Sequence, residues 1–299
     1  MKKGFLLVLL TAIISGVSIF LNSFGVKGIN PFIFTGMKNF IVGMLLLSII
    51  LSFKYFNELK NLKRKDWQDL ILIGFIGGSI PFLLFFKGLQ LINGVQAAFV
   101  HKTMVVWVVF LSMFLLKEKL DKKIVFGAML LLTGNFLMLK LSSFDLSFGL
   151  LLVFLATVFW SFEIILSKKV LKRLSGNIVA LGRMFFGALF ISIFLISTGQ
   201  ISLVLDLGLS QIAWICLTSL FLLGYVMTFY NGLKLVSASS AVAILSLGSV
   251  ITTILKLVFL DAVVSFSQIT GMMLLVVGIL VFTVTIENLK KFYSIFSTA

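Results

Sequence analysis

Charged residues are scarce in this sequence. Only 12% of its 299 residues are Asp, Glu, Lys or Arg, whereas 60% are hydrophobic. A water-soluble domain of this length needs a much larger polar fraction to cover its surface. Most side chains must therefore face lipid, which argues against a soluble enzyme and predicts an integral membrane protein embedded in the bilayer.

Proline, cysteine and histidine are rare as well. Two prolines leave the long apolar segments with few forced kinks. The single cysteine, Cys216, cannot form a disulfide within the chain, and its place in an apolar run predicts a small buried hydrophobic residue. The single histidine, His101, has no partners at metal-ligand spacing, so we expect no metal site.

Several nucleotide-binding and catalytic motifs are missing. The sequence has no Walker-type phosphate loop, no dinucleotide fingerprint and no nucleophile elbow, so we expect no cofactor and no ATP-binding module in this chain. The net charge of +15 could suggest nucleic acid. However, the basic residues lie in short segments between apolar runs, which is typical of membrane topology.

Ten apolar segments are long enough to cross a bilayer as helices. The first follows Met1-Lys2-Lys3 and resembles a signal peptide, but it is long and has no clear cleavage site, so we interpret it as a retained helix. The ten predicted spans are 4–26, 31–53, 67–86, 94–116, 124–141, 148–167, 177–197, 211–231, 239–260 and 267–286.

The basic residues predict the orientation of these helices. If the N-terminus is cytoplasmic, 18 of the 25 Lys and Arg residues fall in cytoplasmic segments and only three in external ones. This bias predicts that both termini are cytoplasmic. The short loops fit a multi-pass protein of a bacterial-type inner (cytoplasmic) membrane.

The two halves of the sequence repeat each other. A shift of 144 aligns residues 88–139 with 232–283 without a gap, and a shift of 145 fits better near the N-terminus. We therefore expect one repeat over 1–145 and a second over 146–299. The glycines carry the match best, as Gly127 aligns with Gly271 and Gly134 with Gly278.

Each repeat contains five helices, and an odd number places the second copy upside down in the membrane. The basic loop 54–66 accordingly aligns with 198–210, which has no basic residue. The expected fold is an all-α membrane protein with ten transmembrane helices in two inverted repeats. Such repeats are typical of secondary transporters, which bind substrate between the halves and alternate between two states.

Local motifs in these helices resemble those of the drug/metabolite transporter superfamily, in its ten-helix EamA-type branch. The motifs are Pro31 with Lys38, Arg183 at the matching place, Phe-Lys-Gly-Leu at 86–89, Tyr-Asn-Gly-Leu at 230–233, and Leu-Lys-Glu-Lys at 116–119. The usual prolines of the fourth and ninth helices are absent. The resemblance covers nearly the whole chain and implies transport of metabolites or drugs without specifying which.

Two polar stripes predict a central site. Ser18 and Asn22 belong to one face of the first helix, and Ser246 belongs to one face of the ninth. The repeat aligns Ser15 with Trp160, Ser18 with Glu163, and Ser246 with Lys102. If the stripes face a cavity, then Trp160, Glu163 and Lys102 should face it too.

Each of these candidate residues has at least one functional and one structural interpretation. Lys102 either binds an anionic group of the substrate or extends to the external interface. Glu163 either binds a cationic group or carries a coupling proton, unless it is a solvated ion-pair partner near the cytoplasmic end. Tyr225 could stack on a substrate or pack in the core, and His101 could relay a proton or pack through a hydrogen bond.

These patterns favour a secondary transporter of a small metabolite, such as an amino acid or a related compound, that works by alternating access. An exporter of hydrophobic drugs or a lipid flippase is the alternative, and it would need an apolar, laterally open cavity. A membrane-embedded enzyme would need a tighter cluster of polar residues. A receptor or scaffold would not need the inverted repeat.

Overall fold

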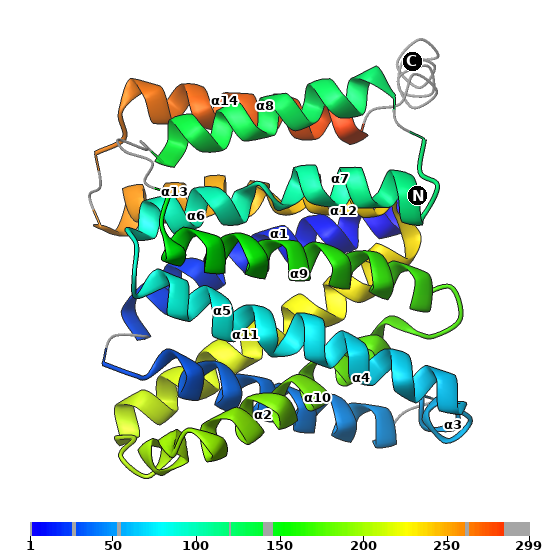
Figure 1. Cartoon of the computed structure of the whole chain (residues 1–299). Coiled ribbons are helices and arrows are strands. Elements are labelled where there is room, and N and C mark those ends of the chain that lie inside the picture. The colour runs from blue at the N-terminus through cyan, green and yellow to red at the C-terminus, as the bar shows by residue number, and fades with distance from the viewer. Residues whose placement is uncertain are drawn as a thin grey trace.

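The computed structural model describes residues 2–25, 28–52, 55–119, 121–139, 146–260 and 263–283, and every regular element in these ranges is helical. Figure 1 shows the helices running side by side. The first repeat holds α1 (Lys2–Gly25), α2 (Pro31–Ser52), α3 (Phe56–Lys60), α4 (Arg64–Gly78), α5 (Ile80–Leu89), α6 (Gly94–Lys102), α7 (Met104–Leu115) and α8 (Lys122–Leu139). The second holds α9 (Phe148–Val170), α10 (Gly176–Ser197), η1 (Gln200–Val204), α11 (Leu209–Leu235), α12 (Ala238–Leu245), α13 (Leu247–Leu260) and α14 (Phe266–Thr283).

Ten helical stretches in the described residues are long and apolar enough to cross a membrane, which confirms the predicted number. Most starts and ends differ from the prediction by a few residues. The largest difference is in the eighth span, which extends to Leu235 rather than to residue 231. The predicted ends at 26, 53, 141 and 286 lie outside the described residues, as do Lys27, Lys54, Lys140, Lys290 and Lys291.

Three of the spans are interrupted rather than continuous, and only the first of these interruptions lies next to a proline. The third span breaks at Ser79, between α4 and α5, just before Pro81. The fourth breaks at Thr103 and the ninth at Ser246, where backbone hydrogen bonds join residues three apart. Thr103 and Ser246 lie at nearly equivalent places in the two repeats although neither span contains proline.

The packing of α8 on α14 shows the inverted symmetry directly. A Cβ added to Gly134 would lie 2.8 Å from the carbonyl oxygen of Gly271, and one added to Gly271 would lie 2.6 Å from that of Gly134. Gly127 and Gly278 approach each other in the same way. The sequence repeat aligns Gly127 with Gly271 and Gly134 with Gly278, so exchanging the repeats maps one contact onto the other. Small residues at both crossings let the two backbones meet.

The remaining helices form two bundles, each completed by one helix of the other repeat. In the first bundle, α4, α5, α6 and α7 of the first repeat pack on α9. In the second bundle, α11, α12 and α13 of the second repeat pack on α1. Helices α2 and α10 pack on each other and contact α11 and α4 respectively, at the side of the molecule away from α8 and α14.

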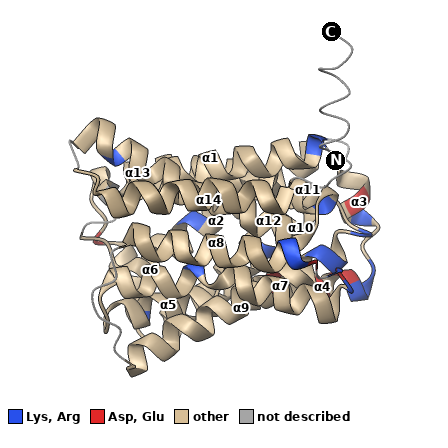
Figure 2. Cartoon of the chain, turned by 90° about the horizontal axis from the view of Figure 1, so that it is seen from above, with Lys and Arg blue, Asp and Glu red and all other residues tan. Residues whose placement is uncertain are grey.

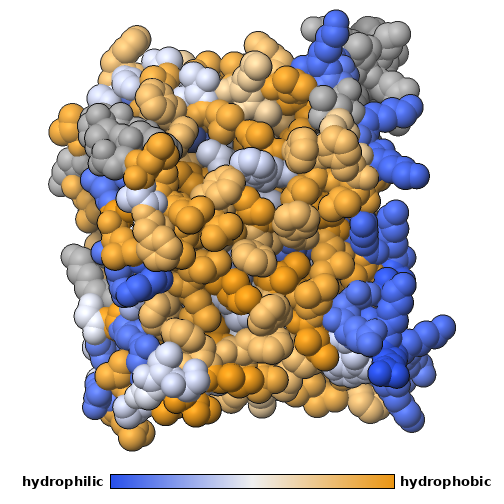
Figure 3. All heavy atoms as spheres, in the orientation of Figure 1, coloured by the Kyte–Doolittle hydropathy of each residue, from blue (hydrophilic) through white to orange (hydrophobic). Residues whose placement is uncertain are grey.

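Charged residues collect at one end of this arrangement. Figure 2 shows Lys, Arg, Asp and Glu gathered near α3 and the start of α4, at the same end as the N-terminus. We call this the basic end and the other the opposite end. Figure 3 shows a wide hydrophobic surface between the two ends. Cys216 of α11 is exposed, so the expectation of a buried cysteine is wrong. A thiol is apolar enough to face lipid as readily as a core.

Candidate functional site

The interruption between α4 and α5 exposes backbone carbonyl groups inside the bundle. Pro81 has no N–H, so the carbonyl of Gly77 lacks the partner that a regular helix would give it. Phe82 donates its N–H to Ser79, at 2.9 Å, instead of to Gly78. Both glycine carbonyls must therefore find other donors, because an unpaired carbonyl in a membrane is costly.

Side chains from three other helices supply these donors. Trp160 Nε1 of α9 donates to the Gly77 oxygen at 3.2 Å, and Arg183 of α10 donates to the same oxygen at 3.3 Å. Asn39 of α2 donates to the Gly78 oxygen at 2.9 Å. The proline in the third span therefore explains why a tryptophan and an arginine converge on one point.

Glu163 of α9 lies next to this point. Its side chain is 2% exposed and touches Gly77 so closely that a Cβ there would lie 2.2 Å from the Glu163 Cγ. Its Oε1 accepts hydrogen bonds from Ser167 Oγ at 2.6 Å and from Tyr230 of α11 at 2.7 Å. The interpretation of Glu163 as a solvated ion-pair partner is therefore wrong, because tight glycine packing brings α9 close to α4 and covers the carboxylate.

A buried cation and a second tyrosine complete this polar centre, which we define as Glu163, Arg183, Trp160, Tyr225 and Tyr230. Arg183 is 9% exposed and interacts electrostatically with Glu163 and both tyrosines, but it forms no ion pair within 4 Å of any described acid. Its Nε is buried and has no hydrogen-bond partner among the described residues. Arg183 therefore retains an unused donor close to a buried carboxylate.

Aromatic rings extend the polar centre toward α6. The Trp160 ring packs edge-on against His101 with centroids 4.9 Å apart, and also against Phe82 and Phe85. The Nδ1 of His101 is buried without a described partner. Tyr225 is half-buried and stacks on Phe229 at 5.8 Å. His101 and Trp160 thus belong to one aromatic cluster with Phe82 and Phe85, whereas the described ring contacts of Tyr225 are with Phe229.

Lys102 is at the end of α6, immediately before the interruption at Thr103. It is half-buried and makes no hydrogen bond or ion pair with the residues that the structure describes. In particular, it does not pair with Glu163. Both interpretations of Lys102, as an anchor for an anion and as an interfacial residue, stay open.

The predicted stripe residues are not brought into contact with Glu163. Ser18 and Asn22 of α1 are half-buried and joined to each other at 3.4 Å, and the Asn22 Oδ1 has no described partner. Ser246 is buried and donates to the carbonyl of Val242 at 3.4 Å. These residues occupy the second bundle and its junction, whereas Glu163 and Trp160 belong to the first.

A separate apolar groove opens on the side of the first bundle. Its volume is about 760 Å³, and it lies between α6, α7, α8 and α9. Its lining includes Phe99, Thr103 and Trp107 on one side and Leu132 and Phe154 on the other. Thr103, where the fourth span is interrupted, is one of the residues that line the groove.

The sequence analysis did not predict the roles of three residues that lie in or next to the polar centre. Ser167 is four residues after Glu163, a spacing that places both on one helix face, so this signal was available. Tyr230 is part of the Tyr-Asn-Gly-Leu motif at 230–233, and that motif gives no sign that its hydroxyl donates to Glu163. Arg183 was noted as a family position without a partner. Among the described residues no three His, Cys, Asp or Glu side chains gather as metal ligands.

Comparisons with known proteins agree with this architecture. A protein of Clostridium kluyveri described as an uncharacterized transporter is 24% identical over 290 residues, which cover 93% of this chain and 92% of that protein. A crystal structure with 21% identity covers 95% of this chain and 97% of its own, with a TM-score of 0.78, and therefore shares the fold. The EamA-like transporter family matches residues 2–140 and 147–284. The chain therefore belongs to the EamA-like transporter family.

Proposed function

We propose that this EamA-family transporter is a secondary transporter of a small metabolite, such as an amino acid or a related compound, and that it works by alternating access. The observation that carries the proposal is the burial of Glu163 beside Arg183 without a direct ion pair between them. A charged residue at the centre of a membrane helix costs roughly 2.5–3.5 kcal/mol on insertion scales. Two such residues that do not neutralise each other directly suggest a ligand that contacts both.

An amino acid carries the two complementary charges. Its ammonium group would bind Glu163, replacing hydrogen bonds from Ser167 and Tyr230 that are neutral and exchangeable. Its carboxylate would bind the unused Nε of Arg183, since guanidinium groups match carboxylate geometry. Lys102 is a second cation that could hold the carboxylate in another conformation.

The other predicted residues would complete the site. We propose that Trp160 and Tyr225 contact the substrate side chain, and that Ser18, Asn22 and Ser246 contact it from the second bundle. His101 or Glu163 would carry a coupling proton if transport is driven by a proton gradient. Both termini would be cytoplasmic in a cell inner membrane, as the distribution of basic residues indicates.

A ligand screen by thermal unfolding of the purified protein tests this proposal. A ligand that binds the folded state raises the unfolding temperature by mass action. We expect a group of amino acids to raise it for the native protein and for Asp121→Asn, an exposed control. The effect should disappear in Glu163→Gln. An equal shift in Glu163→Gln would remove Glu163 from the site.

The apolar groove favours a second candidate function. The groove has a volume of about 760 Å³ and is lined by aromatic and aliphatic side chains. It suits a hydrophobic drug or a lipid acyl chain that enters from the bilayer. Hydrophobic cations and short-chain phospholipids therefore belong in the same screen. If only these compounds stabilise the protein, and if Val106→Trp in the groove lining abolishes their effect, then drug or lipid export replaces amino acid transport.

A further inference from the structure

The two bundles touch at the basic end and separate at the opposite end. At the basic end α7 of the first bundle packs on α12 of the second, and Ser112 Oγ lies 2.9 Å from Ser239 Oγ. The inverted repeat relates this pair of helices to α13 and α6 at the opposite end. Within the described residues α6 and α13 make no extended contact. The described state is therefore asymmetric across the membrane.

Polar contacts between the bundles close the basic end. Glu118, after α7, accepts the backbone N–H of Ala238 at 2.8 Å with one oxygen and the hydroxyl of Ser239 at 2.8 Å with the other. A carboxylate at the start of a helix also interacts favourably with the helix dipole. Glu118 of the first bundle thus caps α12 of the second.

A lysine makes the converse contact. Lys168 of α9 donates to the carbonyl oxygens of Leu233 at 2.6 Å, Lys234 at 3.2 Å and Val236 at 2.5 Å. These carbonyl groups lie at the C-terminal end of α11, where the helix itself offers them no donor. A cation is favourable there because the helix dipole is negative at this end. The side chain of Lys234 in turn donates to Leu174, at 3.0 Å, in the loop after α9. Each bundle therefore caps a helix end of the other.

The residues equivalent to these at the opposite end cannot form the same contacts. The repeat aligns Glu163 with Ser18 and Tyr230 with Phe86, which has no hydroxyl to donate. Ser112 aligns with Lys256 and Ser239 with Val95, and both Lys256 and Val95 are exposed. Closure of the opposite end therefore cannot reproduce the Glu163–Tyr230 and Ser112–Ser239 hydrogen bonds of the basic end.

We propose that Glu118, Lys168 and the Glu163–Tyr230 pair form a polar latch that holds the basic end closed while the opposite end is open. The latch rests on the alternating-access function proposed above, since only such a transporter needs to open and close each end. The latch would also couple substrate binding to the opening of the basic end. A ligand that takes Glu163 from Tyr230 removes the one latch contact that lies within the polar centre, and this favours opening toward the basic end.

Cysteine accessibility in the full-length protein tests the latch without any substrate. In a Cys216→Ser background, Ser112→Cys reports on the basic end and Val95→Cys on the opposite end. With the latch intact, a maleimide reagent should label position 95 quickly and position 112 slowly. Lys168→Met or Glu118→Gln should raise labelling at 112 by roughly tenfold and lower it at 95, because each removes charged hydrogen bonds.

Matched controls separate the latch from general loosening. Lys169→Met removes an exposed lysine next to Lys168, and Asp121→Asn removes an exposed acid near Glu118, so neither should change labelling. Unchanged labelling at 112 in both latch variants would overturn the proposal, as would a rise at 95 and 112 together. Because no ligand is added, a failed ligand screen leaves this result intact, and a failed latch leaves the substrate assignment intact.

Discussion

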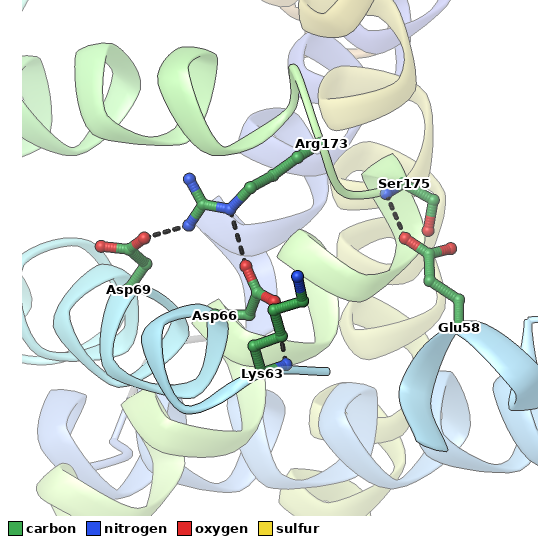
Figure 4. Close-up of polar contacts among 6 residues, drawn as sticks. All are labelled: Glu58, Lys63, Asp66, Asp69, Arg173 and Ser175. Atoms are coloured by element: carbon green, nitrogen blue, oxygen red, sulfur yellow. Dashed lines mark hydrogen bonds and ion pairs between the residues drawn. The ribbon is translucent and has the colours of Figure 1, made fainter. Parts of the chain in front are cut away.

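Asp66 and Gln211 occupy equivalent positions in the two repeats, and each accepts a hydrogen bond from the backbone N–H three residues earlier, at 3.0 and 2.9 Å. Each side chain then reaches the equivalent loop of the other repeat. Asp66 binds Arg173 at 2.6 Å, whereas Gln211 donates to the carbonyl oxygen of Gly28 at 3.1 Å. The two repeats therefore make the equivalent contact in different ways. At the basic end it is the Asp66–Arg173 ion pair, shown in Figure 4, and at the opposite end it is the neutral hydrogen bond from Gln211 to Gly28.

This ion pair should contribute modestly to stability. Arg173 bridges Asp66 and Asp69, and its side chain is 39% exposed, so we expect Arg173→Gln to lower the free energy of unfolding by about 1 kcal/mol. Chemical denaturation measures this. Added salt should shrink the difference, and Lys172→Gln, which removes an exposed lysine, should show none. A larger loss in the Lys172 variant would contradict the account.

The stability contributed by the Asp66–Arg173 ion pair should persist at alkaline pH. The hydrogen bond to Asp66, aided by that to Asp69, raises the pKa of Arg173 above its ordinary value. A cation whose pKa is raised on folding contributes stability that is lost only as the pH rises through that value. The difference between native protein and Arg173→Gln should therefore stay constant from about pH 7 to pH 9. A difference that disappears over this interval would show that Arg173 is not the group responsible.

Gly77 should not tolerate a side chain. A Cβ at this position would lie 2.2 Å from Glu163 Cγ, so Gly77→Ala must displace α4, α9 or the carboxylate. We expect a loss of about 1–3 kcal/mol in unfolding experiments together with loss of ligand binding. Gly224→Ala is the matched control, because its nearest neighbour is the end of the Ile14 side chain at 3.3 Å. Equal stability of both variants would contradict the described packing.

The indole N–H of Trp160 should matter separately from its ring. Trp160→Phe keeps an aromatic ring against His101 and Phe85 but leaves the Gly77 carbonyl with one donor fewer. We expect a loss of about 1 kcal/mol in thermal or chemical unfolding. Trp67→Phe removes an indole N–H for which the described residues offer no hydrogen-bond partner, so it should cost less. The reverse order would indicate that ring volume alone determines the effect.

Orientation is testable in intact cells. Lys60 lies at the basic end and Ser202 at the opposite end, and both are exposed. In a Cys216→Ser background we expect an impermeant maleimide to label Ser202→Cys on intact cells and Lys60→Cys only after permeabilisation. Labelling in the reverse order would place the basic end outside and overturn the prediction from the charge distribution.

The sequence was sufficient to predict the number of spans and the inverted repeat, because both depend on local properties. Apolar length defines a span, and the Gly127 and Gly134 register defines the repeat. The interruptions at Thr103 and Ser246 were not predicted, because no proline marks them and three-residue hydrogen bonding depends on the surrounding packing. Only the break before Pro81 had a local signal.

The polar centre was only partly predictable. The repeat pointed to Glu163 and Trp160 as equivalents of the helix 1 stripe, and these two residues do share the Gly77 region. It could not show that Tyr230 donates to Glu163, since that contact joins helices from different bundles. Contacts between side chains of different bundles depend on how the two bundles are placed relative to each other. The spacing of residues along the sequence does not contain this information.

We propose above that this transporter exchanges an amino acid or a related compound through a site that includes Glu163. Counterflow in proteoliposomes tests it most directly, because trapped unlabelled substrate drives accumulation of its labelled form without ATP. We expect at least one amino acid to accumulate transiently with the native protein and with Asp121→Asn, and not with Glu163→Gln. Absence of counterflow for every amino acid, or equal counterflow in Glu163→Gln, would contradict the account.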